Sequence, residues 1–389
     1  MERSLDQNPQ LLLLVAGAKG AIGTTLAVMA AVLQSSPQQV VPYLTTADKF
    51  SHLGNCGSVV IAGWDRSSEE LSAAIGRHGV LSEELWRPYE SKIAETLLLE
   101  APEPNGTLAE QVARLKGDIQ QLCERSPGSR PVLINLLPAA CDVSDPDRYD
   151  QIEELLNRPA AALLPDIAYV VAAVECGVPV VNFTPNTVEL QAICAYSVEK
   201  GVPIAGRDGK TGQTYFKVVL ASALKARGLY VDGWYSLNIL GNADGLNLMD
   251  PENACGKLKN KTRLLDDILG YPVGERHGRT THKVHIDYYP PRGDAKEAWD
   301  VIDIAGVFGM PMSLRLNLQG RDSILAAPMV LDLARWVAAL QTAEIFGPVP
   351  ALGFYFKKPV GDHAPLTFEE QLASLSRLEA QIETRISKE

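Results

Sequence analysis

Closely spaced cysteines are missing from this chain of 389 residues. It has six cysteines, none of which forms a CxxC pair, and they lie far apart at Cys56, Cys123, Cys141, Cys176, Cys194 and Cys255. In a chain of this length, such a pattern argues against a disulfide framework and favours reduced thiols. We therefore expect a cytoplasmic protein.

Long apolar runs and an excess of basic residues are also missing. The run Leu11–Ala16 is too short to span a bilayer, and it leads directly into glycines. Lysines and arginines number 36 against 47 aspartates and glutamates, which gives a formal net charge of −11. These deficits argue against a membrane protein and against a nonspecific nucleic-acid binder, which needs a basic surface. No Walker A loop and no serine–histidine–acid arrangement can be recognised either.

The residues that are present indicate a globular α/β protein of about two domains. Short apolar segments that favour strands alternate with helical stretches such as 108–124 and 166–176. The expected strands are 11–16, 40–44, 58–64, 131–137 and 178–183. This alternation predicts a doubly wound parallel sheet, which is a Rossmann-type architecture.

The pattern changes after about residue 214. A helical segment is followed by stretches such as 282–291 and 312–320, in which apolar and polar residues alternate, as in strands with one wet face. We expect an α+β domain with a largely antiparallel sheet over 215–328. The first domain would then comprise 9–214 and 329–389, ending in an amphipathic helix over 367–386.

Three glycines follow the first expected strand at Gly17, Gly20 and Gly23, where a helix begins. Glycines at such a turn let the backbone approach a pyrophosphate, and the helix N-terminus faces it with free N–H groups. Asp48 and Asp65 are both candidates for the acid that binds the ribose. The alternative is an ordinary strand-to-helix turn with solvent-exposed aspartates.

Two further segments carry side chains suited to an anionic substrate. The loop 206–214 is rich in glycine and polar groups and precedes a helix, so its amides could bind a phosphate or could form a surface turn. Lys257 and Lys261 share one helical face, where like charges repel unless an anion offsets them. Lys296 ends the segment 292–296 (RGDAK), and Lys357 stands at the end of an apolar run. For all four lysines, the alternative is an ordinary surface lysine.

Histidine and acid side chains near residue 285 are weaker candidates for a metal site. In a strand, His285 and Asp287 would face one way and His282 the other, which leaves too few ligands on one face. The local sequence therefore favours no metal here.

The order of these motifs resembles the myo-inositol-1-phosphate synthase family from about residue 10 to 360. Lys257 and Lys261, four residues apart, match two lysines of the family. The other matching segments are KTGQT (210–214), GNADGLNL (241–248), GDAK (293–296), RDSILAAP (321–328) and KKP (357–359).

The resemblance implies an NAD-dependent isomerase that converts D-glucose 6-phosphate to 1L-myo-inositol 1-phosphate. The implied steps are C5 oxidation, enolisation, intramolecular aldol closure and re-reduction. A homotetramer is also implied, and whether a monovalent or divalent cation assists stays open. The implied catalytic residues are Lys257, Lys261, Lys296, Lys357, Asp208 and Asp294, which would form one pocket against the nicotinamide. The implied substrate-binding residues are Thr211, Gly212, Gln213, Asn242, Asp244, Asn247 and Leu248. The implied cofactor-binding residues are Gly17, Ala18, Gly20, Ala21, Ile22, Gly23, Asp65, Asp244, Asp322 and Ser323.

Three departures from the family pattern keep alternatives open: Arg207, Ala243 and the apolar stretch 137–140. They motivate a related cyclase that acts on another sugar phosphate. Two further alternatives are an NAD-dependent sugar-phosphate dehydrogenase with net hydride transfer and a non-catalytic NAD-binding regulator. The retained lysines argue against the last, because a degenerate site would not need placed cations.

Overall fold

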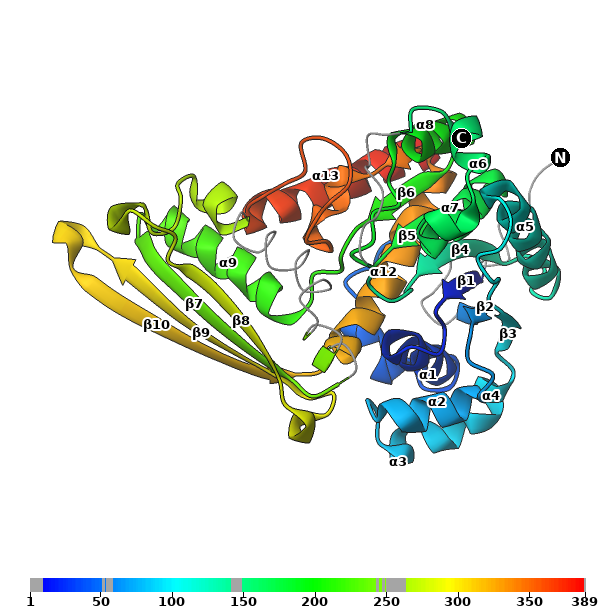
Figure 1. Cartoon of the computed structure of the whole chain (residues 1–389), viewed down its shortest axis with the longest axis horizontal. Coiled ribbons are helices and arrows are strands. Elements are labelled where there is room, and N and C mark those ends of the chain that lie inside the picture. Colours follow the sequence, from blue (N-terminus) through cyan, green and yellow to red (C-terminus); the bar gives the residue numbers. More distant parts are fainter. Residues whose placement is uncertain are drawn as a thin grey trace. The chain divides into compact units, whose positions relative to one another are not determined.

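The computed structural model describes residues 10–50, 53, 59–140, 149–242, 245–246, 249 and 264–387 (Figure 1). The chain forms two compact units, which we describe one at a time. Unit 1 comprises 1–209, 326–364 and 376–389, and unit 2 comprises 210–325 and 365–375. Unit 2 therefore interrupts unit 1 in the sequence.

A parallel sheet of seven strands forms the centre of unit 1. Its order is β11-β6-β5-β4-β1-β2-β3, so the first six strands follow the arrangement of dinucleotide-binding folds, with a switch point between β1 and β4. The strands are β1 (Leu11–Ala16), β2 (Val59–Asp65), β3 (Leu97–Glu100), β4 (Arg130–Asn135), β5 (Val180–Asn182), β6 (Pro203–Gly206) and β11 (Gly347–Pro348). The predicted Rossmann-type sheet is confirmed.

Continuous apolar sequence produces the central strands. Every residue of β1 is buried, as expected for a strand covered on both faces. Helices supply that cover, and α5 packs against α7. The α-helices that lie wholly in unit 1 are α1 (Ala21–Ser35), α2 (Leu71–His78), α3 (Glu83–Trp86), α4 (Glu90–Ala94), α5 (Leu108–Glu124), α6 (Ile152–Leu156), α7 (Pro165–Glu175) and α8 (Gln191–Glu199).

One predicted strand is wrong. The segment 40–44 contains a 3-10 turn at Val41–Tyr43 instead of a strand. Pro42 cannot donate to a strand ladder, and the backbone N–H groups of Thr45 and Thr46 donate to the Asp332 carboxylate at 3.0 and 2.9 Å. The segment itself bonds within local turns, and a side chain holds the two residues that follow it.

A long apolar helix, α12 (Asp322–Thr342), is the one described helix whose length and composition would suit a membrane span. Most of its apolar window is buried inside the protein, so it has the character of a core helix. Its first residues belong to unit 2 and the remainder to unit 1. The last helix, α13 (Phe368–Ile386), is likewise divided, with its N-terminal part in unit 2.

Unit 2 contains a four-stranded mixed sheet with one long helix, α9 (Gly212–Ala226), packed on it (Figure 1). The order is β10-β9-β7-β8, in which β7 pairs parallel to β8 and antiparallel to β9. The predicted largely antiparallel sheet is therefore confirmed, with one parallel pair. The strands are β7 (Tyr230–Leu240), β8 (His282–Tyr288), β9 (Lys296–Ala305) and β10 (Pro311–Gly320).

The described structure also has helical residues at 264–269 in unit 2 and several short 3-10 turns. The 3-10 turns lie at Pro37–Gln39, Val41–Tyr43, Arg87–Tyr89, Ala160–Ala162, Glu275–His277, Pro290–Arg292, Val307–Gly309 and Pro350–Phe354.

Candidate active site

The glycine turn joins β1 to α1 at the carboxyl edge of the unit 1 sheet. Gly17 has φ +85°, and a Cβ there would lie 2.9 Å from the Leu136 carbonyl oxygen. A Cβ on Gly23 would lie 2.4 Å from the Ala18 carbonyl oxygen, so this position must lack a side chain for α1 to pack against the turn. Gly20 caps α1 without a side chain, which leaves the first helical N–H groups open to a ligand.

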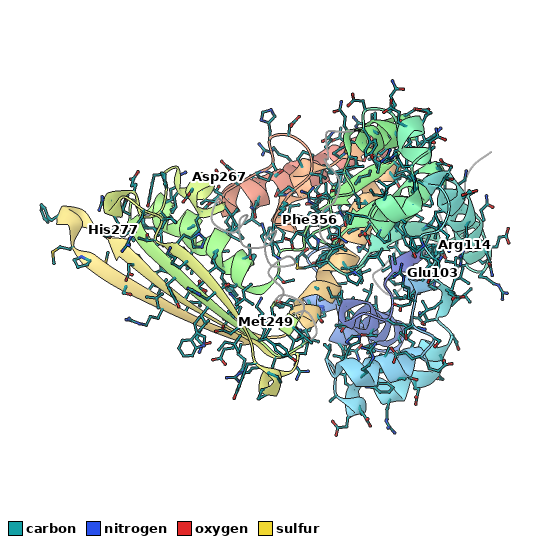
Figure 2. The ribbon with its side chains drawn as sticks, viewed as in Figure 1. Glu103, Arg114, Met249, Asp267, His277 and Phe356 are labelled. Carbon is teal, nitrogen blue, oxygen red and sulfur yellow. The ribbon has the colours of Figure 1, made fainter. Side chains whose placement is uncertain are left out.

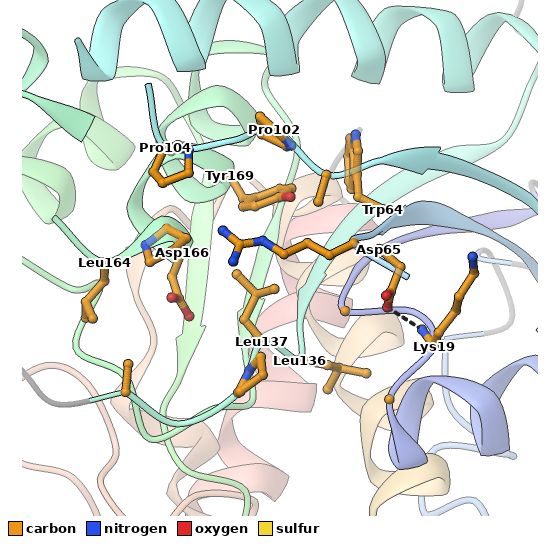
Figure 3. A pocket seen from close by; sticks show the side chains of 18 of the residues that line it. Lys19, Trp64, Asp65, Pro102, Pro104, Leu136, Leu137, Leu164, Asp166 and Tyr169 are labelled. Atoms are coloured by element: carbon orange, nitrogen blue, oxygen red, sulfur yellow. Dashed lines mark hydrogen bonds between the residues drawn. The ribbon is translucent and has the colours of Figure 1, made fainter. Parts of the chain in front are cut away.

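Asp65 ends β2 beside this turn. One of its oxygens accepts the backbone N–H of Lys19 at 2.7 Å, and the other accepts the backbone N–H of Ser67 at 2.9 Å (Figure 3). Each carboxylate oxygen can accept a further donor, such as a hydroxyl. The alternative candidate, Asp48, is exposed on a different segment and is not part of the cavity wall.

A cavity of about 450 Å³ opens next to Asp65 (Figure 3). The segments that follow β1, β2, β3 and β4 line it, which is where ligands bind in open α/β sheets. Trp64 and Tyr169 meet edge to face in its wall, with ring centroids 5.3 Å apart. The volume and apolar walls suit a small organic ligand.

A buried carboxylate, that of Asp166, lies in the wall of this cavity. Asp166, in the first turn of α7, accepts hydrogen bonds from Asn135 at 2.7 Å and Asn186 at 2.9 Å. Asn186 in turn accepts the backbone N–H of Ala140 at 2.9 Å. Burial raises the pKa of Asp166, although the two amide donors oppose that rise. This arrangement fixes the 136–140 loop, and sequence reasoning missed it.

Asp208 and Lys357 form an ion pair in unit 1, with Nζ and Oδ1 2.8 Å apart. The backbone N–H of Lys357 also donates to the Asp208 carbonyl at 2.8 Å, so two segments far apart in sequence are joined. Gly209 lies directly against Phe183, where a Cβ would be 2.1 Å from the ring. The carboxylate keeps the Lys357 ammonium oriented.

In unit 2, Asp322 connects an implied substrate-binding residue, Thr211, with an implied catalytic residue, Lys296. Its carboxylate accepts the Thr211 hydroxyl at 3.1 Å and the Lys296 ammonium at 3.1 Å. Thr211 is the N-cap of α9, and Asp322 begins α12. The Asp322 oxygen also lies 3.0 Å from where a Gly212 Cβ would be. Lys296, Thr211 and Gly212 are therefore brought together around one carboxylate.

The remaining implied residues fall into separate places. Asn242 donates to Asp294 at 3.1 Å in unit 2. Ser323 is buried in the first turn of α12. Ala21 and Ile22 form the start of α1. Five residues lie outside the described part of the chain: Asp244, Asn247, Leu248, Lys257 and Lys261.

Gln213 lies at the start of α9, but its side chain is directed into unit 2. The side-chain amide donates to Asp300 at 2.8 Å and accepts from Asn238 at 2.8 Å. Its backbone N–H, in the first turn of the helix, is the group that can face a ligand. His282 is buried against Lys217, while His285 and Asp287 are exposed. Among the described residues, no group of three or more His, Cys, Asp or Glu side chains could hold a metal ion.

Comparison with known proteins finds a family-model match in unit 2 and relatives that match a larger part of the chain. A family model described as myo-inositol-1-phosphate synthase matches residues 212–323. Inositol-3-phosphate synthase 1 of Bacteroides thetaiotaomicron is 45% identical over 207 residues, which are 52% of this chain and 48% of that protein. Inositol-3-phosphate synthase of Spirodela polyrhiza is 30% identical over 311 residues, which are 72% of this chain and 59% of that protein. The chain thus spans about half to three fifths of the curated relatives that it matches.

Solved structures extend the likeness of the fold to nearly the whole chain. Inositol-3-phosphate synthase of Caenorhabditis elegans superposes with a TM-score of 0.79 at 20% identity, covering 97% of this chain and 86% of that one. A myo-inositol-1-phosphate synthase-related protein of Thermotoga maritima superposes with a TM-score of 0.78 at 20% identity, covering 96% of this chain and 98% of that one.

Proposed function

Because the chain belongs to the myo-inositol-1-phosphate synthase family, we propose that it converts D-glucose 6-phosphate to 1L-myo-inositol 1-phosphate with NAD. The observation that carries this proposal is the grouping of Lys296, Thr211 and Asp322 at the start of α9. Lys296 and Asp322 lie within the segment that matches the family model, and Thr211 directly precedes it. A cation, a hydroxyl and a helix N-terminus together suit a phosphate.

The glycine turn and Asp65 fit NAD. A Cβ on Gly17 would collide with the Leu136 carbonyl, so only a glycine lets the turn pack on this segment. Gly20 leaves the first N–H groups of α1 without a side-chain cap, which suits a pyrophosphate. We assign the adenosine end to the cavity beside Asp65, whose oxygens can still accept ribose hydroxyls. When bound, NAD would supply the acceptor and later the donor of the C5 hydride.

Lys296 and Thr211 are assigned to the substrate phosphate and nearby oxygens. The Lys296 ammonium and the Thr211 hydroxyl bind the two oxygens of the same carboxylate, that of Asp322, so they lie close together. The first N–H groups of α9 are further donors. Asp322 is part of both the implied cofactor set and this cluster. Asn242 and Asp294 are assigned to orienting the substrate, since they pair with each other.

Lys357 is assigned to proton transfer and to the oxygens on which charge develops. Enolisation and ring closure place negative charge on oxygen, which a fixed cation stabilises. Asp208 holds that cation in place. Lys257 and Lys261 complete the proposed set, and their participation stays a prediction because both lie outside the described residues.

We also propose that the chain forms a homotetramer through the sheet of unit 2. Side chains project from the face of that sheet opposite α9 (Figure 2). Apolar residues are exposed along β9, β10 and the turn between them: Trp299, Val307, Phe308, Met310, Met312 and Leu314. Such an exposed apolar set indicates a protein–protein contact, and a second copy of the chain offers a matching surface.

The test is to incubate the protein with glucose 6-phosphate and NAD and to analyse the products. We expect an inositol phosphate without net NADH, because the hydride is returned. A Lys357→Met variant should lose turnover by orders of magnitude while it still binds NAD, whereas Lys200→Met, at a surface ion pair with Glu199, should behave as wild type.

Two results would refute this assignment. Steady accumulation of NADH would identify a dehydrogenase. Turnover of another sugar phosphate, with none of glucose 6-phosphate, would identify a related cyclase, which the apolar 137–140 loop motivates.

A further inference from the structure

A buried polar network lies beneath the first two turns of α9, where an apolar core would be expected. We call it the Asp300 network, and all of its members are buried in unit 2. They are Gln213, Lys217, Trp234, Ser236, Asn238, His282 and Asp300. None of these side chains except Gln213 has a place in the proposed reaction, so the network needs its own explanation.

The Asp300 carboxylate is the centre of the network. It is 2% exposed and accepts three side-chain donors. The indole of Trp234 donates at 2.7 Å and the hydroxyl of Ser236 at 2.6 Å to one oxygen, and the amide of Gln213 donates at 2.8 Å to the other. The positive charge of Lys217 also interacts with Asp300. These partners offset the cost of burying a carboxylate.

The charge of Asp300 determines how Gln213 is oriented. An ionised carboxylate only accepts hydrogen bonds, so the amide NH₂ group of Gln213 must face it. The amide oxygen of Gln213 then faces Asn238, which donates to it at 2.8 Å. Both ends of the Gln213 amide are thereby fixed, and reversing the amide would place an oxygen against the carboxylate.

The start of α9 needs such an internal tether. Gly212, the first helical residue, has φ +50° and no side chain to restrict it. Thr211 makes no capping bond to the helix with its side chain, because its hydroxyl donates to Asp322. The bond from Thr211 to Asp322 restrains the cap, and the Gln213 side chain restrains the first turn from inside unit 2.

Stability alone does not account for a buried carboxylate and lysine. Replacing buried charged groups by well-packed apolar residues is often neutral or stabilising. A polar network of this kind instead specifies one arrangement of the groups that it holds.

We propose that Asp300 is a positioning residue for the sugar-phosphate site, acting through Gln213 on the first turn of α9. By holding Gln213, it keeps the backbone N–H groups of residues 212–214 directed at the substrate phosphate. This inference rests on the proposed function, because it takes the start of α9 as the phosphate site.

The test is an Asp300→Asn variant, in which an NH₂ group replaces one carboxylate oxygen and faces either the Gln213 amide donor or the Trp234 and Ser236 donors. We expect the KM for glucose 6-phosphate to rise roughly tenfold, the effect of losing one charge-assisted hydrogen bond, with a smaller change in kcat. The Kd for NAD should stay unchanged. Asp303→Asn, an exposed position on the same strand, is the matched control and should leave both constants unchanged.

A double-mutant cycle separates positioning from a general loss of packing. If Asp300 acts through Gln213, Asp300→Asn combined with Gln213→Met should be no worse than Gln213→Met alone. Asn238→Ala, which removes the other bond to Gln213, should raise the KM in the same direction. Should Asp300→Asn fail to fold, Asn238→Ala carries the test. A lowered Tm with an unchanged KM in a folded variant would overturn the proposal.

Two measurements test the role of Asp300 without depending on which sugar phosphate is the substrate. Inorganic phosphate binding by calorimetry should weaken in Asp300→Asn even if glucose 6-phosphate is not turned over by the wild type. Amide hydrogen exchange at residues 212–216 should become faster in that variant and stay unchanged in Asp303→Asn. Unchanged phosphate binding together with unchanged exchange would refute the role of Asp300.

Discussion

At the scale of single residues, burial shifts the pKa of several side chains that have no unusual feature in the sequence. Burial lowers the pKa of Lys217 to about 8, and the negative charge of Asp300 opposes this shift. Lys210, held by Gln371 at 2.8 Å, has its pKa lowered to about 7 by burial. Burial raises the pKa of Asp332 against four hydrogen bonds from two threonines. Such groups make stability depend on pH.

Lys217 gives a pH dependence with a definite sign. Between about pH 8 and its ordinary value of 10.5, the folded protein holds fewer protons at Lys217 than the unfolded chain does. The free energy of unfolding of the wild type should therefore rise with pH in this window relative to Lys217→Met, by at most about 1.4 kcal/mol per pH unit. Urea unfolding at several pH values measures this difference.

Lys217→Arg is the control for this prediction, because an arginine does not titrate in the window. The difference between wild type and Lys217→Arg should grow with pH in the same way. A difference that stays constant or shrinks as the pH rises would contradict the assignment of the shift to Lys217.

At the scale of elements, close backbone packing makes some glycines of the chain indispensable and leaves others replaceable. Gly23 in α1 lies against the Ala18 carbonyl, where a Cβ has no space. Gly117 in α5 has nothing within 4 Å of the position that a Cβ would take. Both stand inside helices, so helix propensity treats them alike and only packing separates them.

Substitution by alanine should therefore have opposite effects at these two positions. Gly117→Ala should raise the free energy of unfolding by about 0.5–1 kcal/mol, because alanine costs less backbone entropy in a helix. Gly23→Ala should lower it by roughly 1–3 kcal/mol through overpacking and should also weaken NAD binding. Chemical denaturation and NAD titration of the two variants provide the measurement. Equal stability of both variants would show that α1 and the turn can separate without cost.

At the scale of the whole molecule, the exposed apolar face of unit 2 predicts self-association. Phe308 is 95% exposed and has φ +60°, a backbone conformation that asparagine adopts more readily than phenylalanine. Phe308→Asn should keep the fold and remove apolar contact, and Met312→Lys would add a charge nearby. We expect a wild-type mass near four times the 42.1 kDa chain and a smaller assembly for the variants.

Sedimentation or light scattering checks this expectation. Tyr43→Asn serves as the control, since Tyr43 is also highly exposed but belongs to unit 1. A wild-type monomer, or variants that keep the wild-type mass, would contradict the proposed interface.

Most of the fold could be predicted from the sequence, because most strands show a hydrophobic pattern within a few consecutive residues. The apolar run Leu11–Ala16 predicts a buried strand, which the structure has. The alternation in 312–320 predicts a strand with one exposed face; the strand is present, but its first half is exposed on both faces. The 40–44 segment was predicted wrongly because it forms local turns, and the two threonines that follow it are held by Asp332, almost three hundred residues away. Local patterns cannot report such a partner.

The candidate site was predictable to the extent that short motifs carry it. The Lys357–Asp208 pair and the Lys296–Asp322 pair join residues that the family motifs already singled out. The supporting groups were not predictable. Asp166 and Asp300 look like ordinary acids in sequence, because what distinguishes them is burial against amides from distant strands.

The interruption of unit 1 by unit 2 has a consequence for protein synthesis. The sequence of unit 1 is interrupted after residue 209 and continues at 326. A ribosome must therefore synthesise the intervening segment before it makes β11 and Lys357. At usual translation rates this delay is roughly 6–23 s. During it, β6 lacks its β11 neighbour and Asp208 lacks its lysine. Nascent chains arrested in this interval should therefore need chaperone protection of the β6 edge.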